Sequence, residues 1–140
     1  MSKLIKVRTD KSIELIIEKI KEKASLFDFV VRGVFDMGKE FRRHGVEVDK
    51  GFEYYSVMLC NPEKAYRGIV GNKIRGALLL PSKQVVIYKE NEETVIAYVK
   101  REKGEVEELL PGDSDFCEGL GISCGKIEGL IKLVGGDYEI

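Results

Sequence analysis

The sequence has neither the long apolar runs nor the charge surplus that are typical of proteins that bind membranes or nucleic acids. No apolar stretch approaches the roughly 20 residues that a membrane-spanning helix needs. The 23 basic residues are balanced by 24 acidic ones, so the net charge of −1 gives no general attraction to nucleic acid or anionic lipid. Lys3, Lys6 and Arg8 interrupt the first residues, which are therefore unlike a secretory signal. We expect a cytoplasmic protein with no nucleic-acid and no membrane partner.

The residues that usually build metal, dithiol and catalytic sites are also scarce. The three cysteines, Cys60, Cys117 and Cys124, form no C-x-x-C pair, and His44 is the single histidine. The sequence contains no phosphate-binding P-loop, no H-E-x-x-H pair and no G-x-S-x-G elbow. We therefore predict no metal site and assign no catalytic residue, and the sequence leaves both enzymatic activity and the cofactor open.

What the sequence does have is the composition of one globular domain. Its 140 residues are 44% hydrophobic and 34% charged, and two halves would each be too small for a core. We expect one domain over residues 1–140. A single glutamine and three asparagines accompany many glutamates and lysines, a bias that is typical of chains from hot environments.

In the first half, hydrophobic periodicity predicts strands that alternate with helices. Asp10 or Ser12 can cap a helix whose apolar residues recur at steps of three and four. A short surface helix over residues 36–45 ends at Gly45. The predicted strands are residues 4–7, 29–35 and 52–60. Both faces of the third strand are largely apolar, which indicates an interior strand or one that meets a partner.

In the second half, a helix start, a hairpin and a terminal helix are predicted. Asn61 can cap a helix that has Pro62 in its first position and runs to about residue 70. Residues 84–89 and 94–100 form an antiparallel hairpin, and residues 101–110 are charged and remain unassigned. The apolar residues of the terminal helix lie on one face: Cys117, Leu120, Cys124, Ile127, Ile131 and Val134.

Glycines leave two interpretations of this last helix open. Gly121, Gly125 and Gly129 are four residues apart, so they can form a stripe that lets another backbone approach closely. Alternatively the helix breaks at residues 119–121 and a shorter one starts at Ser123. Cys117 and Cys124 are two helical turns apart, about 10 Å, which is too far for a disulfide within one helix. We expect both to lie in the core.

One segment of the sequence resembles a known family. A strand that runs into Cys60-Asn61-Pro62, a short helix, Leu79-Leu80-Pro81 and a Val-Val-Ile-Tyr strand follow one another as in the prokaryotic domain of unknown function 302. The resemblance implies a single α+β domain of β-α-β(4)-α type, with a curved antiparallel sheet, helices on one face, and a shape related to the TATA-binding protein. It also implies a homodimer. Some members carry a cysteine after Leu-Pro, but Ser82 stands there in this chain, so a thiol pair between the two loops is excluded.

Four residues are candidates for a ligand site. Asn61 begins a helix whose free amides can bind an anionic group, and Ser82 follows the second proline corner. Cys60 precedes the same helix, where the helix terminus can activate a thiol. His44 can act as its base if the two loops meet, although a histidine before a terminal glycine more often interacts with a helix dipole.

Two functions follow from these residues. The first is a homodimeric binding or interaction protein, with a small-ligand pocket between the Asn61-Pro62 helix start and the Pro81-Ser82 turn. The alternative is a thiol-based redox protein, a metal- or haem-binding protein, or an enzyme that uses Cys60 with His44.

Overall fold

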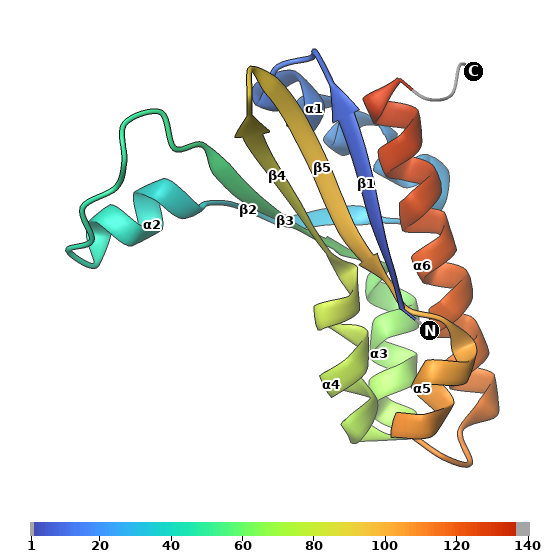
Figure 1. The fold of residues 1–140 in the computed structure, drawn as a ribbon. Helices are drawn as coiled ribbons and strands as arrows, with labels where there is room; N and C mark the ends of the chain where they lie inside the picture. The colour runs from blue at the N-terminus through green and yellow to red at the C-terminus, as the bar shows by residue number, and fades with distance from the viewer. Residues whose placement is uncertain (1, 137–140) are drawn as a thin grey trace.

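The computed structural model describes residues 2–136, which form one antiparallel sheet with helices on one face and at one end (Figure 1). The strand order in the sheet is β1-β5-β4-β3-β2. The strands are β1 (Lys3–Thr9), β2 (Val30–Asp36), β3 (Tyr54–Cys60), β4 (Gln84–Glu90) and β5 (Glu93–Lys100). The predicted α+β class is confirmed, and β3 is an interior strand between β2 and β4.

The helices divide into three groups. The core helices α1 (Ile13–Lys23) and α6 (Ser114–Gly135) pack on one face of the sheet. At one end lie α3 (Pro62–Gly71), α4 (Gly76–Leu79) and α5 (Lys103–Leu109), whereas α2 (Met37–Arg43) projects beyond the other end (Figure 1). Short 3-10 turns complete the connections: η1 (Ala24–Phe27), η2 (Lys73–Arg75) and η3 (Pro81–Lys83).

Local chemistry starts and ends these helices as the sequence predicts. The Ser12 hydroxyl accepts a hydrogen bond from the Leu15 amide at 3.1 Å, so Ser12 and not Asp10 caps α1. Gly45 follows α2 with a φ of 81°, a left-handed conformation that glycine adopts without strain. The 101–110 segment, which the sequence left unassigned, contains α5.

The terminal helix α6 is continuous, so the predicted alternative of a break at residues 119–121 is wrong. A Cβ on Gly121 would lie 3.4 Å from the Lys103 amide nitrogen, and one on Gly129 would lie 2.9 Å from the Phe27 ring. These two glycines therefore allow close packing, as the stripe predicts. Gly125 does not, because a Cβ there would meet nothing within 4 Å.

The core lies between the sheet and the two long helices. Cys117 and Cys124 are fully buried within it, as expected, together with the apolar faces of both helices. None of the helices in residues 2–136 has the length and apolar character needed to cross a membrane.

In the part of the chain that the structure describes, no helix packs across the opposite face of the sheet, and only α2 contacts it, at one end (Figure 1). Cross-strand pairing puts Phe35, Ser56, Val86 and Ala97 in one row on this face. An aromatic row, Phe41, Phe52, Tyr54 and Tyr88, extends along one side of it, with ring centroids 6.2, 6.0 and 5.3 Å apart. We call this surface the open face.

Candidate functional site

The first of the two proline-containing corners, Asn61-Pro62, forms as the sequence indicates. The Asn61 side-chain oxygen accepts a hydrogen bond from the Lys64 amide at 3.1 Å, and Pro62 occupies the first turn of α3. Glu63 lies near the positive end of the helix dipole and pairs with Arg67 one turn later at 2.5 Å. Asn61 thus fixes the direction in which α3 leaves the end of β3.

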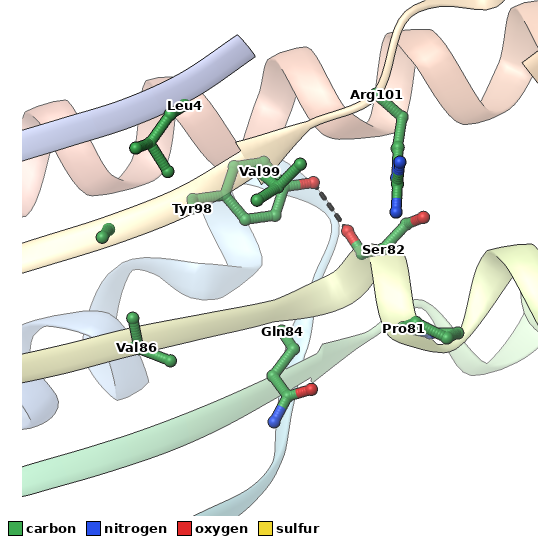
Figure 2. A pocket seen from close by; sticks show the side chains of 9 residues that line it. Leu4, Pro81, Ser82, Gln84, Val86, Tyr98, Val99 and Arg101 are labelled. Carbon is green, nitrogen blue, oxygen red and sulfur yellow. Dashed lines mark hydrogen bonds between the residues drawn. The ribbon is translucent and has the colours of Figure 1, made fainter. Parts of the chain in front are cut away.

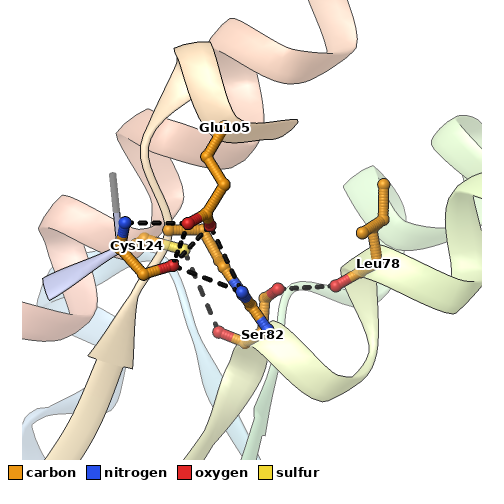
Figure 3. A network of polar contacts seen from close by, with 6 residues as sticks. Leu78, Ser82, Glu105 and Cys124 are labelled. Atoms are coloured by element: carbon orange, nitrogen blue, oxygen red, sulfur yellow. Dashed lines mark hydrogen bonds and ion pairs between the residues drawn. The ribbon is translucent and has the colours of Figure 1, made fainter. Parts of the chain in front are cut away.

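The second corner is η3, where Ser82 is buried and already hydrogen-bonded. Its hydroxyl donates to the Leu78 carbonyl at 2.6 Å (Figure 3). Its carbonyl accepts from the Tyr98 hydroxyl at 2.6 Å and, at 4.0 Å, from the Cys124 thiol. Burial raises the pKa of Tyr98, so its hydroxyl remains protonated and able to donate. Ser82 therefore holds the turn together.

The two corners lie side by side and enclose a cavity of about 30 Å³. Leu59, Cys60 and Asn61 line it from the first corner, and Leu80 and Lys83 from the second. A space of this size holds about one or two water molecules. Ser82, which the sequence predicts at this pocket, is not among the lining residues, and its neighbour Lys83 has that position.

Lys83 is the unusual residue of this cavity. It lies two residues before Val85 and four before Ile87, on the face of β4 that the helices cover, and only 6% of it is exposed. Its ammonium lies 5.4 Å from the centre of the Phe29 ring. No hydrogen bond or ion pair joins this ammonium to another residue within 2–136, although the Lys83 backbone amide donates to the Leu80 carbonyl at 3.3 Å.

Burial lowers the pKa of Lys83 from 10.5 to about 8, because the charged ammonium is removed from water. The sulfur groups of Cys124 and Cys60 oppose this shift, whereas the nearby ammonium groups of Lys64 and Lys126 add to it. Lys126 has its own partner, the Asp28 carboxylate at 2.7 Å. Lys83 is thus a buried amine of which an appreciable part is uncharged near neutral pH.

A groove of about 260 Å³ between α3 and α6 adjoins this cavity. Lys64, Leu79 and Ser123 line both spaces, so the groove leads from the surface toward Lys83. The rest of its wall is mainly apolar or small: Gly68, Phe116, Gly119, Leu120 and Ile122. A Cβ on Gly119 would meet nothing within 4 Å, so the absence of a side chain there keeps the groove open.

An ion pair ties the outer end of the groove together. The Arg75 guanidinium forms a two-pronged pair with Asp113, at 2.7 and 2.8 Å, and donates to the Gly68 carbonyl at 3.0 Å. It also lies 5.1 Å from the centre of the Phe116 ring. This pairing lowers the pKa of Asp113. Arg75 therefore links η2 and α3 to the first residues of α6.

The structure does not bring Cys60 and His44 together. Cys60 ends β3 and is half-buried at the cavity, whereas His44 follows α2 and is exposed. Asp36, which precedes α2, pairs with Tyr55 near the other end of β3, and the strand from Tyr55 to Cys60 spans about 17 Å. The proposed base therefore cannot reach the thiol. Within residues 2–136, no cluster of three or more histidine, cysteine or acidic side chains could hold a metal ion.

Lys83 belongs to no motif and lies beside no thiol in the sequence, so motifs and thiols do not reveal it. A signal was present: the alternation of Val85 and Ile87 puts a lysine on the buried face at the start of a strand. The residues of α6 that line the groove have no comparable signal in the sequence. Gly119 and Ser123 lie opposite α3 only because of the tertiary fold.

A second hollow, also of about 260 Å³, lies on the open face (Figure 2). Leu4, Gln84, Val86 and Val99 surround it, and Arg101 lies at its rim. Val99 is 44% exposed and Leu4 is 68% exposed. This hollow is separate from the groove, and its wall is largely apolar.

Comparison with known proteins agrees with this architecture. Residues 5–104 match the family described as "Domain of unknown function DUF302". The chain belongs to the DUF302 family. This DUF302 chain is also similar to the crystal structure of an uncharacterized conserved DUF302 protein from Bacillus stearothermophilus, with a TM-score of 0.68 and 19% identity over 97% of this chain and 98% of that one.

No curated protein shows significant similarity to the DUF302 chain. The match to the family and the similarity to the crystal structure show the family and the fold, but neither name states an activity. The relation in shape to the TATA-binding protein, the cytoplasmic location and the adaptation to heat stay predictions, because neither match bears on them.

Proposed function

We propose that this DUF302 protein binds a small molecule whose apolar body lies in the groove between α3 and α6 and whose oxygen-bearing head group meets Lys83. The observation that carries the proposal is the buried Lys83 amine, which has no hydrogen-bonding or ionic partner within residues 2–136 and borders a cavity. A buried charge without a partner is unfavourable, and a ligand with an acceptor oxygen would relieve that cost.

The shape of the site limits the ligand. Pockets for small molecules usually have volumes of about 300–1,000 Å³, so this groove and its inner cavity suit a molecule at the small end of that range. The wall is apolar along most of the groove and polar only near Asn61, Ser123 and the two lysines. A short aliphatic or aromatic acid or carbonyl compound matches this distribution.

A binding experiment with hexanoate tests the proposal. Hexanoate should shift the amide resonances of α3 and of residues 116–124 in a saturable manner. Hexylamine should not, because its ammonium group has the same positive charge as Lys83. Gly119→Leu should abolish the shifts because the new side chain fills the groove. Gly125→Leu is the matched control: it adds the same side chain to the same helix where a Cβ is equally free, but outside the groove lining.

Two results would overturn the proposed site. One is that hexanoate binds with equal affinity to the wild-type protein and to Gly119→Leu. The other is that no short acid, aldehyde or ketone perturbs these resonances at any concentration at which the protein stays folded.

We infer further that the protein is a homodimer and that a second copy covers the open face. In support, this face carries exposed apolar side chains on three strands, Leu4, Phe35 and Val99, with exposures of 68%, 45% and 44%. A patch of this kind on an otherwise charged surface is typical of an interface. The hollow beside Val99 offers space for a side chain of the partner.

Light scattering after size-exclusion chromatography tests the dimer. The wild-type protein should have the mass of two chains, and Val99→Glu should have the mass of one. Leu26→Glu is the control, because Leu26 is 62% exposed but lies in η1, away from the open face. A wild-type monomer at micromolar concentration would contradict the proposal, and so would a Val99→Glu dimer.

The alternative, a redox, metal, haem or catalytic site that uses Cys60 with His44, lacks geometric support because β3 separates the two residues. Cys60 alone borders the Lys83 cavity, so a role for its thiol is confined to that site.

A further inference from the structure

We propose that Lys83 reacts with the carbonyl carbon of an aldehyde or ketone held in the groove between α3 and α6, and forms a Schiff base with it. This inference rests on the proposed binding site and specifies its substrate class. The geometry that supports it is a buried lysine that lines the small cavity next to an apolar groove, with no carboxylate paired to its amine within residues 2–136.

The reaction needs no oxidant or reductant. The Lys83 nitrogen attacks the carbonyl carbon, and a proton passes from nitrogen to oxygen to give a carbinolamine. The carbon–oxygen bond then breaks, the hydroxyl takes up the second proton of the nitrogen and leaves as water, and a carbon–nitrogen double bond remains. Cys60 and Ser123 also border the cavity, and their thiol and hydroxyl can relay the protons. An enclosed apolar site favours the imine because it limits the water that would hydrolyse it.

The state of the amine decides whether the attack is possible. Only the neutral form is a nucleophile, and an ordinary lysine, with a pKa near 10.4, is almost entirely charged at pH 7. With a pKa of about 8, roughly a tenth of Lys83 is neutral at pH 7. That fraction is roughly two hundred times larger than for an ordinary lysine.

The groups that face Lys83 come from every element around it. They are Cys60 from β3, Lys64 from α3, and Cys124 and Lys126 from α6, with the uncharged Phe29 ring opposite. No carboxylate is among the main groups that shift its pKa, and none is paired with the amine within residues 2–136. Lys64 and Lys126 instead favour the neutral form.

Reductive trapping tests the inference. The full-length protein is incubated at pH 7 with limiting hexanal and cyanoborohydride, which converts an imine into a stable secondary amine. We expect one hexyl group per chain, mapped by peptide mass spectrometry to Lys83, and labelled roughly a hundredfold faster than the exposed lysines. The rate should rise with pH and level off above about 8. Lys39→Met should keep the label, since Lys39 is exposed on α2, away from the groove.

The variants separate this inference from the proposed binding site. Lys83→Met should lose the fast label, and Gly119→Leu should slow it whereas Gly125→Leu should not. If hexanoate binds in the groove but hexanal labels Lys83 no faster than exposed lysines, the Schiff-base inference is wrong and the binding site stands. If neither probe reaches the groove, both are wrong. Fast labelling of Lys83 that Gly119→Leu leaves unchanged would also contradict the route through the groove.

Discussion

Replacement of Lys83 by methionine should stabilise the protein, although it removes a buried residue of the candidate site. Burial lowers the pKa of Lys83 from 10.5 to about 8, and each pKa unit corresponds to about 1.4 kcal/mol. Keeping the ammonium charged inside the protein therefore costs about 3 kcal/mol of folding free energy at pH 7. The contact with the Phe29 ring, worth about 0.5–2 kcal/mol, is also lost in the variant. The net gain should be about 1–3 kcal/mol.

The gain should depend on pH in a defined direction. Below pH 8 the lysine is protonated in both the folded and the unfolded chain, so the cost is fully present. Between about pH 8 and 10.5 the unfolded chain binds a proton that the folded chain has released, so wild-type stability rises relative to Lys83→Met. The difference between the two proteins should therefore shrink over this range.

Urea unfolding at a series of pH values from 7 to 10.5 measures both effects. Lys39→Met is the control: Lys39 is exposed on α2, so its replacement should change the free energy of unfolding by less than about 0.5 kcal/mol at every pH. The reasoning is refuted if Lys83→Met is less stable than wild type at pH 7, or if the difference between them stays constant as the pH rises.

Three further changes test the surroundings of the site, each by urea unfolding. Tyr98→Phe should destabilise by about 1–3 kcal/mol because the Ser82 carbonyl loses its 2.6 Å hydrogen bond inside the protein, and an unchanged midpoint would contradict that contact. Asn61→Ala should cost about 1 kcal/mol through loss of the α3 cap, whereas Asn61→Gly should cost only a few tenths. Arg75→Leu should lower stability at neutral pH. The deficit should shrink as the pH falls from the ordinary Asp113 pKa of 3.8 through the lowered pKa of the folded protein, where the carboxylate becomes protonated; a deficit independent of pH would show that the ion pair contributes nothing.

The helices and strands could be predicted because their signals are local. Ser12 and Asn61 cap helices with their own side chains, Gly45 ends one, and the alternation along residues 84–100 produces a hairpin. The predicted segments therefore agree with the structure to within a few residues.

The order of the strands and the continuity of α6 depend on contacts between distant residues. β5 lies between β1 and β4, and nothing in the spacing of the sequence fixes that arrangement. From the sequence alone, the glycines of α6 are compatible with a helix break and with a packing surface. The structure decides for packing, because Lys103 lies against Gly121 and Phe27 against Gly129. Such choices are decided by tertiary packing, which a local pattern does not contain.

The position of the two proline-containing turns could be predicted, but not every side chain between them. The two proline corners lie side by side, and Cys60 and Asn61 line the cavity between them. Ser82 stabilises its own turn through hydrogen bonds, whereas the buried Lys83 lines the cavity, because the strand alternation that follows η3 turns Lys83 toward the helices. His44 was excluded only by the antiparallel register of β2 and β3.

The titration of Lys83 tests the central claim most directly. In protein labelled with carbon-13 at lysine Cε, the resonance of Lys83 can be assigned by its absence from Lys83→Met and followed from pH 6 to 11. The account predicts a midpoint near 8, well below those of the exposed lysines, and a shift of that midpoint when hexanoate is added. A midpoint of 10 or higher would show that the amine is hydrated or already paired, and would contradict the site.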